Sequence, residues 1–290
     1  MLILGLLLVA GLLASPTTVA GASSPGPTPG PPSRFVGETL SYSLRAVMTQ
    51  SIAGKDTFGR QINQASTPTS IKLHESIAIT KATQQDISLH RYGTITAVVV
   101  GAKPVTKSGQ GWTTVDSRGL VVRDSGKLGG LFLLPLPFLA NASMKEGAEL
   151  AVGDRWSGRL GTKLYGMTAR PNLTFTVTAE RFVAGAKVYS IDAAGTVPMK
   201  EPVMTVAGDS LGYATGTADI TTHFEYDRDN RRLVSMHAEL NDTLHYRGPA
   251  KRLAGRVRDH QLCDVSLDSS SVSGSVRDEV NAEPSAGPLP

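Results

Sequence analysis

Ser210 lies in Gly208-Asp-Ser-Leu-Gly212, a G-x-S-x-G pattern in which a serine can act as the nucleophile of acyl transfer. Asp242 and His245, spaced as D-x-x-H, could complete a Ser-His-Asp triad. The pattern needs a strand–turn–helix, whereas the residues after it continue as a glycine-punctuated strand. Asp242 and His245 also differ in parity, so a continuous strand directs them to opposite faces. We therefore expect no catalytic residues and a protein that is not an enzyme.

The histidines offer a second chemistry, because two imidazoles and two carboxylates could bind zinc. His223 and His237 lie on two arms of a predicted hairpin that makes them diagonal neighbours, with Asp219 opposite Glu239 on the same face. Polar residues are also what a solvent-exposed face requires, and no H-E-x-x-H, C-x-x-C or EF-hand spacing occurs. We expect no metal and no cofactor. The single cysteine, Cys263, is left either free or paired between chains.

The most unusual segment is residues 131–139, Leu-Phe-Leu-Leu-Pro-Leu-Pro-Phe-Leu. Its two prolines exclude an interior strand or helix. The segment either crosses the core as a buried loop or forms an exposed apolar lip that contacts a lipid, a membrane surface or a partner. The candidate ligand-binding residues are Leu131, Phe132, Leu134, Leu136, Phe138 and Trp156.

The elements that must position these residues read mainly as strands. Apolar and polar residues alternate with period two, which is typical of a strand with one wet face, over residues 40–46, 71–79, 92–100, 119–122, 173–177 and 187–191. Gly, Pro, Asn and Asp clusters separate these runs at short intervals. The best helical window is residues 251–261, and its period is weak. The pattern predicts a mainly β body of about ten antiparallel strands in a meander.

The clearest hairpin joins residues 217–226 to residues 231–246. The apolar residues of both arms have even numbers. Cross-strand partners lie on the same face of a sheet, so these residues share one face only if the numbers of each pair add up to an even value. A three-residue loop at 228–230 satisfies this condition, because Asn230 can adopt the left-handed conformation. Even-numbered residues are then predicted to face the core.

Two strand entries repeat the same pattern 116 positions apart. Residues 36–41 and 152–157 both read V-G-acid-x-apolar-S. Glycine permits a tight turn, and the acid can accept backbone donors there. The repeat reflects either two related halves or a common way to enter a strand, and the second is favoured because little else aligns.

The ends of the chain predict export. Residues 1–22 are uncharged, with an apolar run followed by Ala-Gly-Ala, as in a signal peptide with its cleavage site. Residues 23–33 are a Pro/Gly/Ser-rich tether, residues 34–263 a single β-rich body, and residues 264–290 a disordered acidic tail. No later segment is apolar for long enough to span a membrane. We expect a location in the periplasm, the cell envelope or the extracellular space.

The chain has 290 residues and a net charge of +4, and the two ends differ in sign. Five acidic residues against Arg277 give the tail −4, so the body carries +8. Much of the positive charge lies in Arg247, Lys251, Arg252, Arg256 and Arg258. Such a cluster either binds an anionic lipid or nucleic acid, or is a solvated face that the tail partly neutralises. Because no aromatic residue follows Tyr246 to stack on bases, we expect no nucleic-acid partner.

Several short motifs carry a resemblance to known proteins. They are Phe35-Val-Gly-Glu-x-Leu-x-Tyr42, the Leu-Pro-Leu-Pro of the apolar segment, Val152-Gly-Asp-x-Trp156, and the glycine-rich residues 208–222. Together they resemble a group of exported bacterial proteins whose architecture is similar to the lipoprotein-carrier half-barrels. The resemblance implies a curved antiparallel sheet around an apolar cavity, although no helix is evident to plug it. Separately, residues 208–211 with Asp242 and His245 resemble the GDSL esterases.

These observations favour an exported, non-enzymatic binding or carrier module for an apolar ligand such as a lipid. The alternative is a structural or interaction protein of the cell envelope, held by an envelope protein partner through its tether and tail. A serine esterase that uses Ser210 is the third and least favoured hypothesis. An apolar cavity separates the first two, because a structural module packs its sheet face fully.

Overall fold

The computed structural model describes residues 36–55, 59–65, 68–83, 86–116, 121–124, 150–159, 168–169, 171–204, 210–230, 232–247 and 254–272. All the regular secondary structure within these ranges is β-strand. No helix in the described part of the chain is long and apolar enough to cross a membrane. The predictions for residues 1–22, 23–33 and 131–139 lie outside the described residues.

Twelve strands make up the described structure. Six precede the long undescribed segment: β1 (Glu38–Lys55), β2 (Gln61–Ala65), β3 (Thr69–Ala82), β4 (Asp86–Val99), β5 (Val105–Asp116) and β6 (Val121–Asp124). Six follow it: β7 (Arg155–Arg159), β8 (Asn172–Val183), β9 (Ala186–Met204), β10 (Ser210–Asp227), β11 (Arg232–Arg247) and β12 (Ala254–Val272). Each of the six period-two runs in the sequence overlaps one of these strands.

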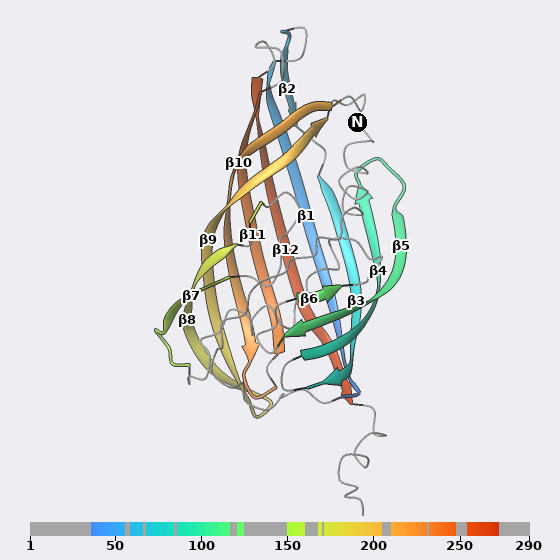
Figure 1. Ribbon diagram of the computed structural model, residues 1–290, viewed down its shortest axis with the longest axis vertical. Helices are drawn as coiled ribbons and strands as arrows, with labels where there is room; N and C mark the ends of the chain where they lie inside the picture. Colours follow the sequence, from blue (N-terminus) through green and yellow to red (C-terminus); the bar gives the residue numbers. More distant parts are fainter. Residues whose placement is uncertain are drawn as a thin grey trace, which may run out of the picture.

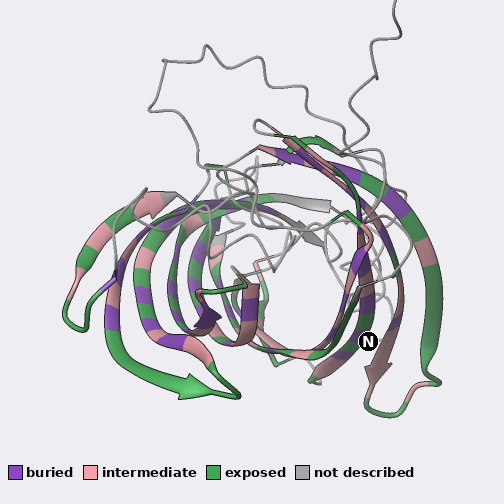
Figure 2. Ribbon diagram, turned by 90° about the horizontal axis from the view of Figure 1, so that it is seen from below, coloured by how far each residue is buried: buried purple, intermediate pink, exposed green. Residues whose placement is uncertain are grey.

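All the strands belong to one antiparallel sheet in the order β6-β5-β4-β3-β1-β12-β11-β10-β9-β8-β7, with β2 paired to one end of β1. Two meanders therefore meet where the first strand pairs with the last, from Glu38 opposite Val272 to Gly54 opposite Gly255. Figure 1 shows this junction at the middle of the sheet, with β1 in blue beside β12 in red. The sheet curls into an incomplete barrel (Figure 2). The predicted fold class, a curved antiparallel meander, is confirmed.

Burial alternates along most strands, so the sheet has one dry face. In β3 the odd residues from Ile71 to Ile79 are buried and their even neighbours are more exposed. The buried face is the concave one, because its side chains reach across neighbouring strands. The Tyr42 hydroxyl on β1, for example, donates to the Leu233 carbonyl on β11, 3.0 Å away, past the intervening β12. The apolar residues thus line the inside of the curve, where curvature brings them into contact.

The predicted hairpin is present, but its register differs near the turn. Even-numbered residues of β10 and β11 face the core over most of the hairpin, as expected. The turn is longer than the predicted loop, because Asp227 pairs with Arg232. A β-bulge after Glu225 shifts the pairing, so that the numbers of paired residues again add up to an even value, 460. His223 therefore lies directly opposite His237. The bulge also turns Leu233 into the core and leaves its neighbour Val234 half-buried.

The repeated V-G-acid pattern is a local device for entering a strand. Gly37 and Gly153 have φ angles of 90° and 96°, in the left-handed region that favours glycine. The N–H of each glycine donates to a carbonyl of a nearby strand, Ile79 and Val177 respectively, at 2.8 Å. The two strands that follow occupy different places, since β1 is central and β7 is an edge. The same turn therefore serves two unrelated positions in the sheet.

One expectation about the C-terminal region is wrong. The weak helical period at 251–261 does correspond to strand from Ala254 onward, in agreement with a body made of strands. The body does not end at residue 263, because β12 continues to Val272 and pairs with β1 throughout. The Ser- and Asp-rich composition of 264–272 reflects one solvent-facing side of a strand, with Val265 buried on the other side.

Candidate functional site

The concave face is the first candidate site in the described structure. Its apolar side chains form one continuous cluster across both meanders. Representative members that are at most 2% exposed are Leu40, Ile77, Leu89, Phe175, Ile191 and Leu244. A surface of this kind can pack against other parts of the chain or against an apolar ligand.

An aromatic row occupies one end of this face. Trp156 on β7 lies directly opposite Phe175 on β8, and their rings stack at 5.4 Å between centroids. Phe175 continues the row to Phe224 on β10, at 6.3 Å. The indole nitrogen of Trp156 is buried and has no hydrogen-bond acceptor among the described residues. Of the six residues predicted to contact a ligand, Trp156 therefore lies at the concave face, whereas the other five lie outside the described residues.

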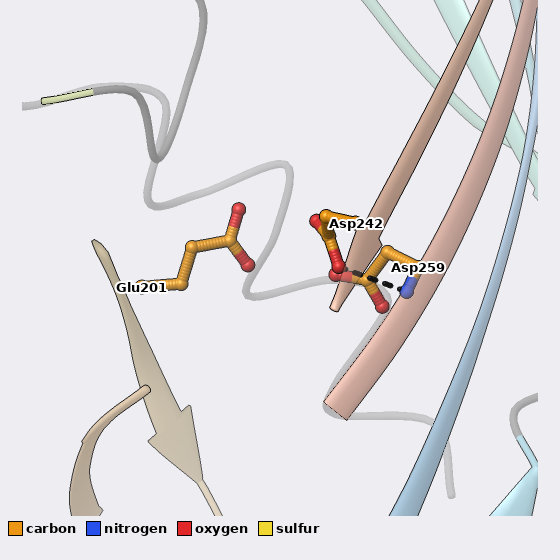
Figure 3. A group of neighbouring side chains, drawn as sticks. All are labelled: Glu201, Asp242 and Asp259. Carbon is orange, nitrogen blue, oxygen red and sulfur yellow. Dashed lines mark hydrogen bonds between the residues drawn. The ribbon is translucent and has the colours of Figure 1, made fainter. Parts of the chain in front are cut away.

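A cluster of three carboxylates, which we call the carboxylate cluster, interrupts the apolar face. Glu201 on β9, Asp242 on β11 and Asp259 on β12 bring one oxygen each to within 4.8 Å of one another, and all three are buried (Figure 3). Asp242 and Asp259 are direct cross-strand partners. Glu201 reaches them over β10, where the core-facing residues are Ala214, Gly216 and Ala218.

The small residues of β10 allow this approach. A Cβ atom added to Gly216 would lie 2.2 Å from the carbonyl oxygen of Thr243, so β10 and β11 are in close contact there. Ala214 and Ala218 flank this position and carry only a methyl group each. No side chain on β10 therefore separates Glu201 from the two aspartates.

The hydrogen bonds of the carboxylate cluster are incomplete. The backbone N–H of Asp259 donates to Oδ1 of Asp242 at 3.0 Å. Oδ2 of Asp242 and Oδ1 of Asp259 are buried and have no hydrogen-bond partner in the part of the chain that the structure describes. A buried polar atom left without a partner costs about 1–3 kcal/mol, and more when it is charged. The cluster is thus costly to keep ionised by itself.

Burial raises the pKa of all three carboxyl groups. The pKa of Glu201 rises from 4.5 to about 8 because of burial, with further increases from the charges of Asp259 and Asp242. The pKa of Asp259 rises to about 7 through burial and the charge of Asp242, against a hydrogen bond from Gln50 that lowers it. The pKa of Asp242 rises to about 6 through burial, partly offset by the N–H of Asp259. The cluster can therefore hold protons, or a cation in their place.

The sequence analysis missed this cluster as a site, although part of the signal was present. The hairpin parity already placed Asp242 among the core-facing residues. The convergence with Glu201 and Asp259 depends on strand pairings that local sequence does not reveal.

A second buried polar group lies in the other meander. Nε of Arg91 on β4 donates to Oε1 of Glu75 on β3 at 2.6 Å, and Nη1 donates to the hydroxyl of Thr113 on β5 at 3.2 Å. Arg91 and Glu75 are each 2% exposed. Here a buried carboxylate has a cationic partner, which the cluster on β9, β11 and β12 does not show.

The histidines on the convex face form separate pairs. His223 bonds to Asp192 at 2.6 Å, and His237 bonds to Asp264 at 2.7 Å. Asp219, predicted to lie opposite Glu239, instead faces Asn241. Within the described ranges, the carboxylate cluster is the group that brings three potential metal ligands together, and it contains none of these histidines.

The serine–histidine–aspartate arrangement does not assemble. Asp242 is 4% exposed on the concave face, whereas His245 is exposed on the other face of the same strand. The predicted separation by parity is confirmed. Ser210 begins β10 opposite Met204, at the far end from the turn of the hairpin. Cys263 is a free thiol on β12, and burial raises its pKa to about 12, which makes a nucleophilic thiolate unfavourable.

No known protein family matches the chain, and no curated protein matches it. Among solved structures, the chain is similar to Ail, the attachment invasion locus protein of Yersinia pestis, in complex with the heparin analogue sucrose octasulfate. The sequence identity is 8%, the match covers 80% of this chain and 99% of that one, and the TM-score is 0.19. The secretin domain β-barrel of InvG from the Salmonella injectisome matches with 10% identity, coverage of 83% and 64%, and a TM-score of 0.12.

Proposed function

We propose that this protein is an exported, non-enzymatic binding or carrier module of the cell envelope that holds an apolar ligand, such as a lipid, on its concave face. The curved sheet turns a continuous apolar surface inward, which is the shape that a hydrocarbon chain requires. The signal-like residues 1–22 support export.

The observation that carries this proposal is the aromatic row that ends at Trp156. Its indole N–H is buried beside apolar rings without an acceptor, which is costly in a folded protein. A carboxylate or ester carbonyl of an amphiphile would accept this hydrogen bond while its chain packs among the apolar side chains. The expected ligand therefore combines hydrocarbon with at least one polar acceptor.

Native mass spectrometry tests the proposal on the mature chain, residues 23–290, purified from the exported fraction. We expect a reproducible adduct of lipid mass, with the lipid recovered by solvent extraction. Replacing Trp156 with Phe removes the donor but keeps the ring, so binding of a fluorescent fatty acid should weaken by up to about tenfold, the effect of one hydrogen bond. Trp112→Phe is the matched control, because Trp112 is 52% exposed on the convex face.

The apolar segment supplies a second variant. Leu134→Ser combined with Phe138→Ser should also weaken the fatty-acid complex if this segment lines the site. A bare protein mass, no extractable lipid and no difference between the two tryptophan variants would contradict the carrier proposal.

The alternative function, an interaction module of the envelope, has its own supporting feature. His90 stacks on Trp112 at 4.5 Å and lies 6.2 Å from Tyr92, and both Trp112 and Tyr92 are about half exposed. This convex patch on β4 and β5 joins two large aromatic side chains at the surface, a composition typical of protein contacts. If native spectra show a bare chain, loss of partner capture in a Trp112→Ala, Tyr92→Ala variant would support this alternative.

A further inference from the structure

We propose that Glu201, Asp242 and Asp259 form a binding site for a divalent cation, and that Ca²⁺ is the ion that fits it. This inference goes beyond ligand carriage and does not depend on it. The three residues come from three strands of one sheet, so the backbone holds their spacing fixed without help from a loop. They meet on the concave face, away from the exposed charges of the convex side.

The spacing of the carboxylate oxygens fits calcium. Ca²⁺ binds oxygen ligands at about 2.3–2.6 Å, so three oxygens placed evenly around the ion lie roughly 4.0–4.5 Å apart. One oxygen from each residue lies within 4.8 Å of the others. Small side-chain rotations therefore bring all three into contact with one Ca²⁺, without movement of the strands. Mg²⁺ binds at about 2.0–2.1 Å and keeps several of its waters, so it suits a buried group of three carboxylates less well.

A second observation points to a ligand, namely the buried oxygens that lack partners. Asp242 is 4% exposed and Asp259 is 8% exposed, yet no donor within the described ranges bonds to Oδ2 of the first or Oδ1 of the second. Figure 3 shows both side chains with their carboxylates turned toward the side on which Glu201 approaches. A cation placed between the three residues would satisfy these oxygens and neutralise their charge.

Other buried carboxylates of this protein show what such oxygens normally receive. Asp227 is 2% exposed, and it accepts from the backbone and side chain of Asn230 and from Nε of Arg232, at 3.0, 2.8 and 3.1 Å. Glu75 is bonded to Arg91 at 2.6 Å. These two buried acidic groups thus have cationic or N–H partners supplied by the chain. The carboxylate cluster differs in placing acid against acid.

The ligand set also selects the class of metal. Three carboxylates supply hard, negatively charged oxygen and no nitrogen or sulfur, which favours Ca²⁺ over Zn²⁺ or copper. Water molecules and backbone carbonyls usually complete the six to eight ligands of Ca²⁺. The histidines lie on the opposite face and cannot contribute.

Isothermal titration calorimetry and thermal unfolding of the mature chain, dialysed first against EDTA, test the proposal. We expect CaCl₂ to bind with a stoichiometry of one and to raise the melting temperature by mass action. Asp242→Asn and Asp259→Asn should each weaken Ca²⁺ binding by about tenfold or more, because affinity follows the number of charged ligands. MgCl₂ at equal concentration should give a smaller shift.

The variants are designed to fold. Asparagine has the shape of aspartate and removes charge repulsion, so each variant should melt at or above the temperature of the EDTA-treated wild type. Asp219→Asn is the matched control, because Asp219 is an exposed carboxylate of β10 that bonds only to a surface threonine in the described contacts. The control should bind Ca²⁺ like the wild type.

Two results would overturn the proposal. One is an EDTA-treated wild type that neither binds Ca²⁺ nor gains stability at about 1 mM, the weak end of natural calcium sites. The other is binding that persists unchanged in Asp242→Asn, Asp259→Asn and Glu201→Gln. If the asparagine variants are more stable than the wild type and the wild type does not bind Ca²⁺, the carboxyl groups of the cluster are protonated in place of binding a cation, and the cation proposal is wrong.

Discussion

The carboxylate cluster should make the stability of the metal-free protein fall as the pH rises. Below the pKa of a free glutamate, Glu201 is protonated in both the folded and the unfolded chain. As the pH increases, the unfolded chain ionises first, near 4.5, whereas folded Glu201 keeps its proton until about 8. Ionisation stabilises the unfolded chain but not the folded one in this interval. The free energy of unfolding therefore falls between the two pKa values and is constant above them.

The size of the loss follows from the pKa difference. A rise from 4.5 to about 8 corresponds to about 5 kcal/mol in the limit of high pH. Part of this is already lost at about pH 5, which leaves roughly 4 kcal/mol between pH 5 and pH 9. Asp259 and Asp242 shift in the same direction, but the three groups interact, so their contributions do not add. The expected loss is comparable with the whole stability of a marginal domain, about 5 kcal/mol.

Urea unfolding in EDTA, followed by tryptophan fluorescence from about pH 5 to pH 9, measures this quantity. Asp259→Asn removes the charge that most strongly affects Glu201 after burial, so its loss over the same range should be clearly smaller than that of the wild type. Asp219→Asn, on the convex face, should reproduce the wild-type profile. A wild type whose stability is flat or rises over this range would refute the reasoning, as would an Asp259→Asn profile identical to it.

Three further predictions concern packing at different places in the sheet. Gly216→Ala should lower the free energy of unfolding by about 1–3 kcal/mol in a urea titration, because the new Cβ would lie 2.2 Å from a backbone oxygen that cannot move without moving the strand. A loss smaller than that of Thr215→Ala would contradict the close approach of β10 and β11. Arg91→Met should cost about 3–5 kcal/mol, since Glu75 then loses its guanidinium partner, and a second change, Glu75→Leu, should restore most of it. In acrylamide quenching, a chain that keeps only Trp112 should be quenched strongly and one that keeps only Trp156 weakly; equal quenching would place Trp156 outside the concave face.

Local pattern was sufficient for most of the secondary structure. The alternation in residues 40–46 and 71–79 predicted β1 and β3, because side chains of a strand alternate between faces whatever the strand pairs with. The same rule separated Asp242 from His245 and so excluded the triad. It failed at 264–272, where a serine-rich wet face was interpreted as a disordered tail. Composition alone does not distinguish a polar strand face from a tail, since both are solvated.

The sequence alone also determined the presence of a hairpin between residues 217 and 246 and the face that its arms turn to the core over most of their length, since both depend on neighbours along the chain. Only the tertiary structure decided that β1 pairs with β12, and that a bulge after Glu225 sets His223 opposite His237. It alone brought Glu201, Asp242 and Asp259 together. These residues are separated by 41 and 17 positions, and what unites them is the pairing order of the sheet, its curvature and the small side chains of β10. Such contacts depend on the packing of distant segments, which no local periodicity records.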